Sequence, residues 1–563
     1  MRYKKLSPNY WLMIRCVLVM ISVSAAVSSA ATLELREIAP GQAKSQYFRV
    51  ETATRLFIDV VLGVLPDTDK RLADAWIVDR HGELVWKMEK ITSRGKLASC
   101  KADLILQPGY YKACYFMTPR KEESGRHWLY SWLFRKSDTH ESSEKWGIKL
   151  EADSIEQLSA VDFYDRASLI ADMSQMVDNQ FRTRGITVLK QAPMEIYAIG
   201  EGDPKKRVMY DYGWIQKADS RELIWKMQVQ NTVHAGGANK NLLARDSFTF
   251  EPGNYLISFI TDDSHSFESW NDFPPFDLDA WGIRLRYSGD QPLDSVVTSY
   301  QEYRSTPLVD LTKVTDNQCL VAGILLRQNS RLYVRAVGEY SISRKKFVDH
   351  GWIMNASTRE TVWSMTYENT MHAGGGTKNR MFDNYIDLDA GKYLVFYATD
   401  SDHAYGAWNE RPPGVEYWWG ITIYSKDAQS ESFISPYEEA TDSLILAQII
   451  KVGDKSKRTK RMVISDTTLV RIYAVGEGDK HSMYDYGWIE DEDANLVWVM
   501  THKNSSDAGG AQKNRLVNDL LQLHPGSYRV FYQSDDSHSY EKWNDLPPDD
   551  QIHWGITVIE LSD

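Results

Sequence analysis

The sequence predicts an all-β protein: four tandem antiparallel β-sandwich, jelly-roll-like domains that follow a signal peptide. A marker of the form "GWI…VW.M" occurs four times, with Ala for Gly in copy 1 and Ile for Val in copy 2, and its first tryptophans, Trp76, Trp214, Trp352 and Trp488, are 138, 138 and 136 residues apart. This period is the length of a whole domain, well above the roughly 20–50 residues of a solenoid repeat. Apolar and polar residues alternate around a Pro-Gly pair in copies 1, 2 and 4, which is typical of half-buried strands.

The recurring markers divide the chain into a leader and four repeats. The predicted segments are a signal peptide over 1–30, then repeats over 31–152, 153–290, 291–427 and 428–563. A closing "WGI" ends each copy, and turn residues recur every 8–12 positions, as in a sandwich of two antiparallel sheets. In the segments between copies we expect the first strand of a module and a short linker helix. The first copy is divergent, because it lacks the polar loops described below.

The first 30 residues carry the features of a cleaved export signal. Arg2, Lys4 and Lys5 form a positive start, Cys16–Val27 is an apolar run, and small residues precede Ala31. Arg15 interrupts the apolar region, and no later stretch reaches the roughly 20 apolar residues of a membrane helix. We therefore expect a secreted or periplasmic protein with no stable membrane span after cleavage.

The composition narrows the range of possible binding partners. The formal net charge is −12, which argues against nucleic acid and against an anionic membrane surface. The chain has 19 Trp and 31 Tyr, residues that fill sandwich cores or form surfaces for sugars and peptides. Composition alone leaves these two uses open.

Three cysteines remain after signal cleavage. Cys100 and Cys114 flank the Pro108-Gly109 turn, which predicts two strands paired as a hairpin. That pairing places Cys100 opposite Met117 instead of Cys114, whereas an oxidising compartment permits a disulfide, so the Cys100–Cys114 bond stays open. Cys319 lies in an apolar strand and is expected to be a buried core residue.

Copies 2 to 4 each contain two polar loops that copy 1 lacks. The acidic-histidine loop is "TDDSHSFESWNDFPP" in copy 2, "TDSDHAYGAWNERPP" in copy 3 and "SDDSHSYEKWNDLPP" in copy 4. The Gly-Gly loop is "NTVHAGGANKN", "NTMHAGGGTKNR" and "NSSDAGGAQKNR", and its second glycine precedes the loop histidine by 28 residues in every copy. Because copy 1 loses both together, we expect them to meet at one edge of the sandwich and to form a shared polar pocket.

These loops supply the candidate ligand-binding residues, which share imidazole, carboxylate, amide, ammonium and indole chemistry. The candidates are His234, Lys240, Asn241, Asp262, Asp263, His265, Trp270 and Asn271 in copy 2; His372, Lys378, Asn379, Asp400, Asp402, His403, Trp408 and Asn409 in copy 3; and Asp507, Lys513, Asn514, Asp535, Asp536, His538, Trp543 and Asn544 in copy 4.

Three interpretations of the loops compete. In the first, the polar groups bond one another and stiffen two long loops, which need such internal partners. In the second, they bind a glycan or cell-wall fragment. In the third, Asp262, Asp263 and Ser264 hold calcium, or His234 and His265 hold zinc with an aspartate. The spacing matches no known ligand pattern, so we assign no metal or cofactor and keep calcium as the alternative.

Enzymatic motifs are missing from the sequence. No G-x-S-x-G, H-E-x-x-H, P-loop or dinucleotide fingerprint stands at a suitable place. Tandem modules are common in binding proteins, where several weak sites give avidity. We therefore predict an exported, non-catalytic binding or scaffolding protein whose partner is a glycan, a cell-envelope component or another protein. The alternative is a secreted hydrolase that acts on glycan or peptide.

The stretches "QPGYYKACYF", "EPGNYLISFI" and "HPGSYRVFYQ" resemble the jelly-roll modules of pre-peptidase C-terminal type, which are appended to secreted bacterial peptidases, and carbohydrate-binding sandwiches. The whole module resembles tandem repeats of secreted bacterial proteins of unknown role. The resemblance implies a sandwich fold and export, and it carries over no catalytic residue.

Overall fold

The structure, a computed structural model, describes residues 31–64, 71–94, 97–119, 146–164, 167–302 and 306–561. Its regular structure is almost entirely β-strand in antiparallel sheets, so the predicted all-β sandwich class is confirmed. The signal peptide predicted over 1–30 lies outside the described residues. So do residues 120–145, which make up most of the divergent loop of repeat 1.

The repeats use their strands in one common order. Repeat 1 contains β1 (Ala31–Arg36), β2 (Ala43–Val50), β3 (Thr54–Gly63), β4 (Ala73–Asp79), β5 (Leu84–Lys87), β6 (Thr92–Arg94), β7 (Leu97–Leu106), β8 (Gly109–Met117) and β9 (Gly147–Ala152), followed by β10 (Glu156–Leu158) and α3 (Ala160–Phe163). Repeat 2 contains β11 (Leu169–Met173), β12 (Phe181–Val188), β13 (Ala192–Asp203), β14 (Val208–Met209), β15 (Tyr212–Lys217), β16 (Leu223–Lys226), η1 (Val229–Asn231), β17 (Val233–His234), β18 (Asn241–Phe250), β19 (Gly253–Ile260), η2 (Leu278–Ala280) and β20 (Gly282–Tyr287), followed by η3 (Leu293–Ser295) and β21 (Val297–Tyr300).

The second half of the chain repeats this order. Repeat 3 contains β22 (Val309–Thr312), β23 (Cys319–Leu326), β24 (Ser330–Ser341), β25 (Lys346–Asn355), β26 (Thr361–Ser364), β27 (Met371–His372), β28 (Asn379–Leu388), β29 (Gly391–Ala398), η4 (Glu416–Trp418) and β30 (Gly420–Ser425), followed by α4 (Ala428–Glu431), β31 (Ile434–Tyr437) and η5 (Glu439–Thr441). Repeat 4 contains β32 (Ile445–Ile449), β33 (Lys457–Ile464), β34 (Thr468–Gly478), β35 (Met483–Glu490), β36 (Leu496–Val499), β37 (Ser506–Asp507), β38 (Asn514–Leu523), β39 (Gly526–Gln533) and β40 (Gly555–Glu560).

Two sheets enclose the core of each repeat. Repeat 1 has the strand orders β1-β9-β3-β7-β6 and β10-β2-β8-β4-β5. Repeat 2 has β11-β20-β13-β18-β17, with β14 beside β13, and β16-β15-β19-β12-β21. In repeats 3 and 4 the corresponding sheets are joined, because β25 or β35 pairs with strands of both. The tryptophans of the closing WGI in repeats 2 to 4, Trp281, Trp419 and Trp554, are fully buried between the sheets.

The Pro-Gly turns do not close hairpins, so that prediction is wrong. β18 pairs with β13, whereas β19 pairs with β12 and β15, and the Pro252-Gly253 turn therefore crosses from one sheet to the other. Alternation shows which face a strand buries, but it does not identify the neighbouring strand. The Tyr255 hydroxyl donates to the Glu251 carbonyl oxygen at 2.9 Å and stabilises the turn that connects the two sheets. The same bond recurs in the other repeats, which explains the shared "GxY" pattern at this turn.

The segments between repeats belong partly to the preceding sandwich. β10 pairs with β2, β21 with β12, and β31 with β23, so each linker adds an edge strand to the repeat before it. The next sandwich starts only at β11, β22 or β32. Short helices occur in two of these segments, as predicted, at α3 and α4. Independent folding of the four segments stays a prediction.

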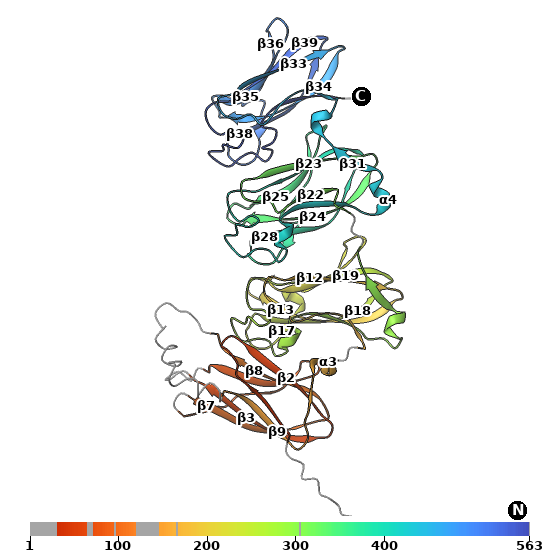
Figure 1. Cartoon of the computed structure of the whole chain (residues 1–563), viewed down its shortest axis with the longest axis vertical. Coiled ribbons are helices and arrows are strands. Elements are labelled where there is room, and N and C mark those ends of the chain that lie inside the picture. The colour runs from red at the N-terminus through yellow and green to blue at the C-terminus, as the bar shows by residue number, and fades with distance from the viewer. Residues whose placement is uncertain are drawn as a thin grey trace, which may run out of the picture.

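The repeats follow one another along the long axis of the molecule (Figure 1). We call the contact region between repeats 1 and 2 junction 1–2, and name the others in the same way. At junction 1–2, Lys112 of β8 is fully buried and binds Asp277 and Asp279 of repeat 2. The Trp76 indole N–H donates to the Phe276 carbonyl oxygen across the same junction at 2.8 Å. The outer face of the β2-β8-β4 sheet is therefore covered by the end of repeat 2 that carries its polar loops.

The next two junctions use the same surfaces with different side chains. At junction 2–3, the rings of Phe181 and Trp418 meet edge to face with centroids 6.1 Å apart. At junction 3–4, Arg359 Nη1 lies 3.2 Å from His553 Nε2, and both residues are buried. Each junction therefore has its own contact chemistry.

The three described cysteines are free thiols. Cys100 lies on β7 in the core of repeat 1, whereas Cys114 lies on β8 and packs in the cluster shared with repeat 2. The two residues belong to opposite sheets, and the disulfide that the sequence left open is not formed. Cys319 is only partly buried and packs at junction 3–4 beside repeat 4, not inside a repeat as expected.

Candidate functional site

The two polar loops of repeat 2 meet, as their joint loss from repeat 1 predicts. The Asn241 side-chain amide donates to the Gly236 carbonyl oxygen at 2.8 Å in its own loop and to the Phe273 carbonyl oxygen at 2.9 Å in the other. These bonds orient the amide, so Asn241 Oδ1 faces His265 Nε2 at 2.7 Å. Repeats 3 and 4 contain the same bonds, and the prediction that the loops meet is confirmed.

The loop histidines are buried hydrogen-bonding groups. In repeat 3, the backbone N–H of Glu410 donates to His403 Nδ1 at 3.3 Å, which places the ring proton on Nε2, where it donates to Asn379. Burial, followed by the nearby Lys240 charge, lowers the pKa of His265 to about 3, and burial lowers that of His403 to about 4. The imidazole rings are therefore neutral at neutral pH. All three histidines adopt a left-handed backbone with φ of 53–58°, which is uncommon outside glycine.

Two tryptophans pack against each histidine. The Trp270 and Trp281 rings lie edge to face with centroids 5.1 Å apart, and the His265 ring lies 5.2 and 5.6 Å from them. Repeats 3 and 4 have the same arrangement. Trp270 is 2% exposed, whereas Trp408 and Trp543 are partly exposed. In repeat 2 this ring is therefore closed to a stacking sugar.

The loop lysine connects the loops to a strand. Lys240 Nζ donates to Asn271 Oδ1 at 2.6 Å and lies 3.1 Å from Glu201 Oε1 on β13. Lys378 and Lys513 make the same two contacts, with Asn409 and Asn544 and with the glutamates of β24 and β34. The lysines thus place a fixed positive charge where the two loops meet, a region that we call the loop joint.

Other candidates lie apart from this joint. His234 and His372 each bond a carbonyl oxygen of their own loop, and Asp507 accepts from the Gly509 N–H, so no described bond joins them to the buried histidines. Asp263 lies 3.4 Å from Arg411 of repeat 3, and the side chains at Asp402 and Asp536 are exposed. The buried geometry is the one that we expect of a structural joint, and ligand binding by these loops stays a prediction.

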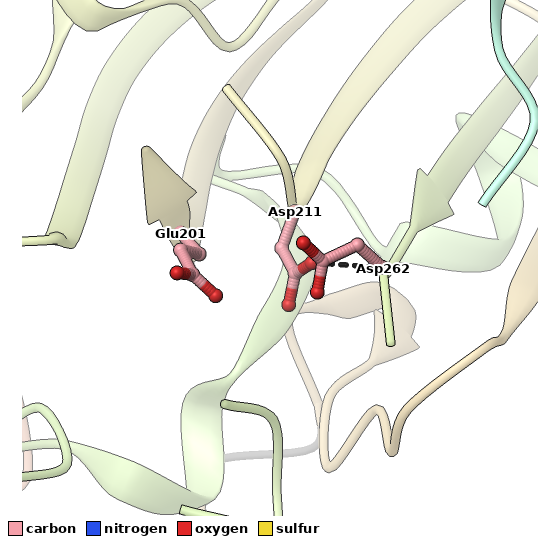
Figure 2. A group of neighbouring side chains, drawn as sticks. All are labelled: Glu201, Asp211 and Asp262. Carbon is pink, nitrogen blue, oxygen red and sulfur yellow. Dashed lines mark hydrogen bonds between the residues drawn. The ribbon is translucent and has the colours of Figure 1, made fainter. Parts of the chain in front are cut away.

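Sequence reasoning missed a group of three carboxylates beneath the joint. Glu201 near the end of β13, Asp211 just before β15 and Asp262 just after β19 have carboxylate oxygens within 4.8 Å of one another (Figure 2). We call this group the carboxylate cluster. Its signal was present in the sequence, because a Gly-Glu step ends the strand and an aspartate precedes "YGW" or "HGW" in each intact copy.

Burial shifts the acidity of the carboxylate cluster. It raises the pKa of Glu201 to about 7, an effect that Lys240 only partly offsets. It also raises the pKa of Asp262 to about 6, and that of Asp211, which is fully buried, well above its usual range. Raised pKa values of this kind follow from placing several carboxylates close together in a buried position.

Comparison with known protein families and with curated proteins gives no match for this chain. The resemblance to secreted jelly-roll and carbohydrate-binding modules thus stays an expectation. No helix in the described ranges from residue 31 to residue 561 is long and apolar enough to cross a bilayer.

Proposed function

We propose that this protein is an exported, non-catalytic scaffold that binds a glycan component of the cell envelope. The observation that carries the proposal is a cavity of about 510 Å³ at junction 3–4, lined in part by Tyr340, Phe347, Tyr367, Asp507 and Asp549. Its volume falls within the usual range for small-ligand sites. Aromatic rings stack on the apolar faces of sugars, and carboxylates accept hydroxyl hydrogen bonds.

The stacked repeats support the scaffold part of the proposal. The cavity walls come from two repeats, and the Glu439 carboxylate, which pairs with both Arg359 and His553, holds these repeats together. A ligand at this junction thus meets a preformed site. Asp507, a candidate from the sequence, lies in this cavity and not with the buried histidines.

Glycan binding is tested on the full mature chain with an array of envelope oligosaccharides. We expect Tyr367→Ala to weaken binding at least about tenfold, because truncating a contact aromatic commonly costs more than 1 kcal/mol. Tyr484→Ala is the matched control: Tyr367 and Tyr484 are 51% and 40% exposed, and Tyr484 lies outside the cavity. Equal loss in both variants, or no binding by the wild type, contradicts the proposal. Turnover of any oligosaccharide favours the hydrolase alternative.

Junction 3–4 is expected to loosen at alkaline pH. His553 is buried, which by itself lowers its pKa, but Asp550 and Glu439 outweigh burial and raise it from 6.5 to about 9. The folded protein therefore holds this proton more tightly than the unfolded chain does. The resulting stabilisation is complete below pH 6.5 and is lost as the pH rises through about 9.

Acid acts on the same junction through Glu439. Burial tends to raise the pKa of Glu439, but His553 and Arg359 lower it from 4.5 to about 2, so its contribution disappears as the pH falls through that range. Limited proteolysis between residues 426 and 444 is expected to be slow near pH 6 and faster at pH 9.5. Junction 1–2 is the internal control, because the pKa of Lys112 is held well above 10.5. Equal rates at pH 6 and pH 9.5 contradict this prediction.

A further inference from the structure

We propose that each intact repeat binds one calcium ion in its carboxylate cluster. The three clusters have the same composition, one glutamate and two aspartates, and in each the ligand oxygens lie within 4.8 Å of one another. The ligands are Glu201, Asp211 and Asp262 in repeat 2; Glu339, Asp349 and Asp400 in repeat 3; and Glu477, Asp485 and Asp535 in repeat 4.

The backbone holds the cluster in place before any ion binds. The Asp262 N–H donates to Asp211 Oδ1 at 2.7 Å, and the Trp281 indole N–H donates to Asp211 Oδ2 at 3.0 Å. The backbone N–H groups of Tyr210 and Asp211 both donate to the Glu201 carbonyl oxygen. In Figure 2 the Glu201 carboxylate faces those of Asp211 and Asp262. A preformed arrangement of this kind lowers the cost of ordering ligands around a cation.

A second observation points to a missing ligand. Glu201 is 7% exposed, and its Oε2 is buried with no hydrogen-bond donor among the described residues, although Oε1 contacts Lys240. The equivalent oxygens of Glu339 and Glu477 are also buried and have no donor in the part of the chain that the structure describes. Buried acceptors nearly always have a partner, because burial without one is costly. The same orphan atom in three copies indicates that a cation belongs there.

The charge of the cluster suits a divalent ion. With all groups ionised, three carboxylates and the single ammonium of Lys240 sum to −3 + 1 = −2. One divalent cation cancels this charge. Asp262 is the partly exposed member of the triad and gives the ion a side open to water.

The donor set favours calcium over zinc or magnesium. All ligands are carboxylate oxygens, which hard cations prefer, whereas zinc prefers nitrogen and sulfur. Calcium binds oxygen at about 2.3–2.6 Å, so oxygens on opposite sides of one ion are roughly 5 Å apart. Magnesium usually keeps several water ligands and takes only one or two carboxylates, so a built-in set of three carboxylates favours calcium.

Repeat 1 provides a natural control, since it replaces all three acids together. Strand register places Gly63, Ala73 and Thr118 at the three positions. A side chain on Gly63 would lie 2.2 Å from the Trp146 ring, so this ring fills the space that the glutamate occupies elsewhere. Complete replacement is the pattern expected of ligands that act as one group.

The test is calcium stoichiometry, measured by equilibrium dialysis and calorimetry on the full mature chain after chelator treatment. We expect three ions per chain for the wild type. We also expect terbium, bound in place of calcium, to give tryptophan-sensitised emission, because Trp281 contacts Asp211. A wild type with no saturable calcium uptake overturns the proposal and assigns the neutralising role to protons and Lys240. This result does not depend on the folding of any variant or on glycan binding.

A single substitution assigns the ligands. Glu201→Gln preserves shape and is expected to reduce the stoichiometry from three to two. The matched control, Asp263→Asn, changes the residue beside Asp262 that lies outside the cluster, and it should leave three ions bound. Three ions on a folded Glu201→Gln variant, or loss of an ion from Asp263→Asn, overturns the assignment. If Glu201→Gln does not fold, Glu339→Gln and Glu477→Gln make the same comparison in repeats 3 and 4.

Discussion

Lys112→Ala is expected to separate repeats 1 and 2. Burial alone lowers the pKa of Lys112, but Asp277 and Asp279 outweigh it and hold the pKa well above 10.5, so the ammonium is charged. The substitution leaves two carboxylates, 5% and 3% exposed, without this cation. Breaking a buried ion pair by removing one partner typically costs about 3–5 kcal/mol. Hydrogen exchange should rise on β8 and on η2, and small-angle scattering should report a more flexible particle.

Two further variants show whether charge is the cause. Lys101→Ala removes an exposed lysine that pairs with Asp59, and exposed pairs contribute at most about 1 kcal/mol, so this variant should behave as the wild type. Lys112→Leu combined with Asp277→Val and Asp279→Tyr installs the side chains of Leu256, Val415 and Tyr417, which occupy the equivalent positions of junction 2–3. Replacing a buried ionic group with packed apolar side chains is often neutral. A triple variant as unstable as Lys112→Ala would show that shape, not the unpaired acids, controls the junction.

The sequence predicted the architecture because it contains the same information four times. The spacing of Trp76, Trp214, Trp352 and Trp488 marks the period, and alternation marks the strands. The contact between the two polar loops was predictable because repeat 1 lacks both of them. Alternation does not specify partners, however, and the Pro-Gly turns were therefore misread as hairpins when they cross between sheets.

Two features depend on residues that are far apart in sequence or that look exposed. Asp211 and Asp262 are 51 positions apart and approach only because β15 and β19 are neighbours. Lys112 occupies a strand position that faces away from the core of its own repeat, where a lysine ordinarily meets water. Only the stacking of repeat 2 on this face turns it into a buried charge.

His265→Ala is expected to destabilise the loop joint of repeat 2 by about 3 kcal/mol. The change opens a cavity beside Trp270 and Trp281 and leaves Asn241 Oδ1 buried without its donor. Local hydrogen exchange should therefore increase over residues 234–241 and 261–275. Because the chain has four repeats and two-state unfolding is not assured, local exchange is a better measure than a single melting curve.

His234→Ala is the matched comparison, because both histidines were candidates from sequence but their surroundings differ. His234 is exposed and bonds only the Ala238 carbonyl oxygen among the described residues, so its loss should cost less than about 1 kcal/mol. If the loops are a structural joint, His265→Ala loosens them while glycan binding at junction 3–4 persists. If the loops instead form the ligand site, His265→Ala abolishes binding with exchange unchanged, which contradicts the joint. Equal exchange in both variants would mean that the His265–Asn241 bond contributes little, and the tryptophan packing would then be the main source of order in the loops.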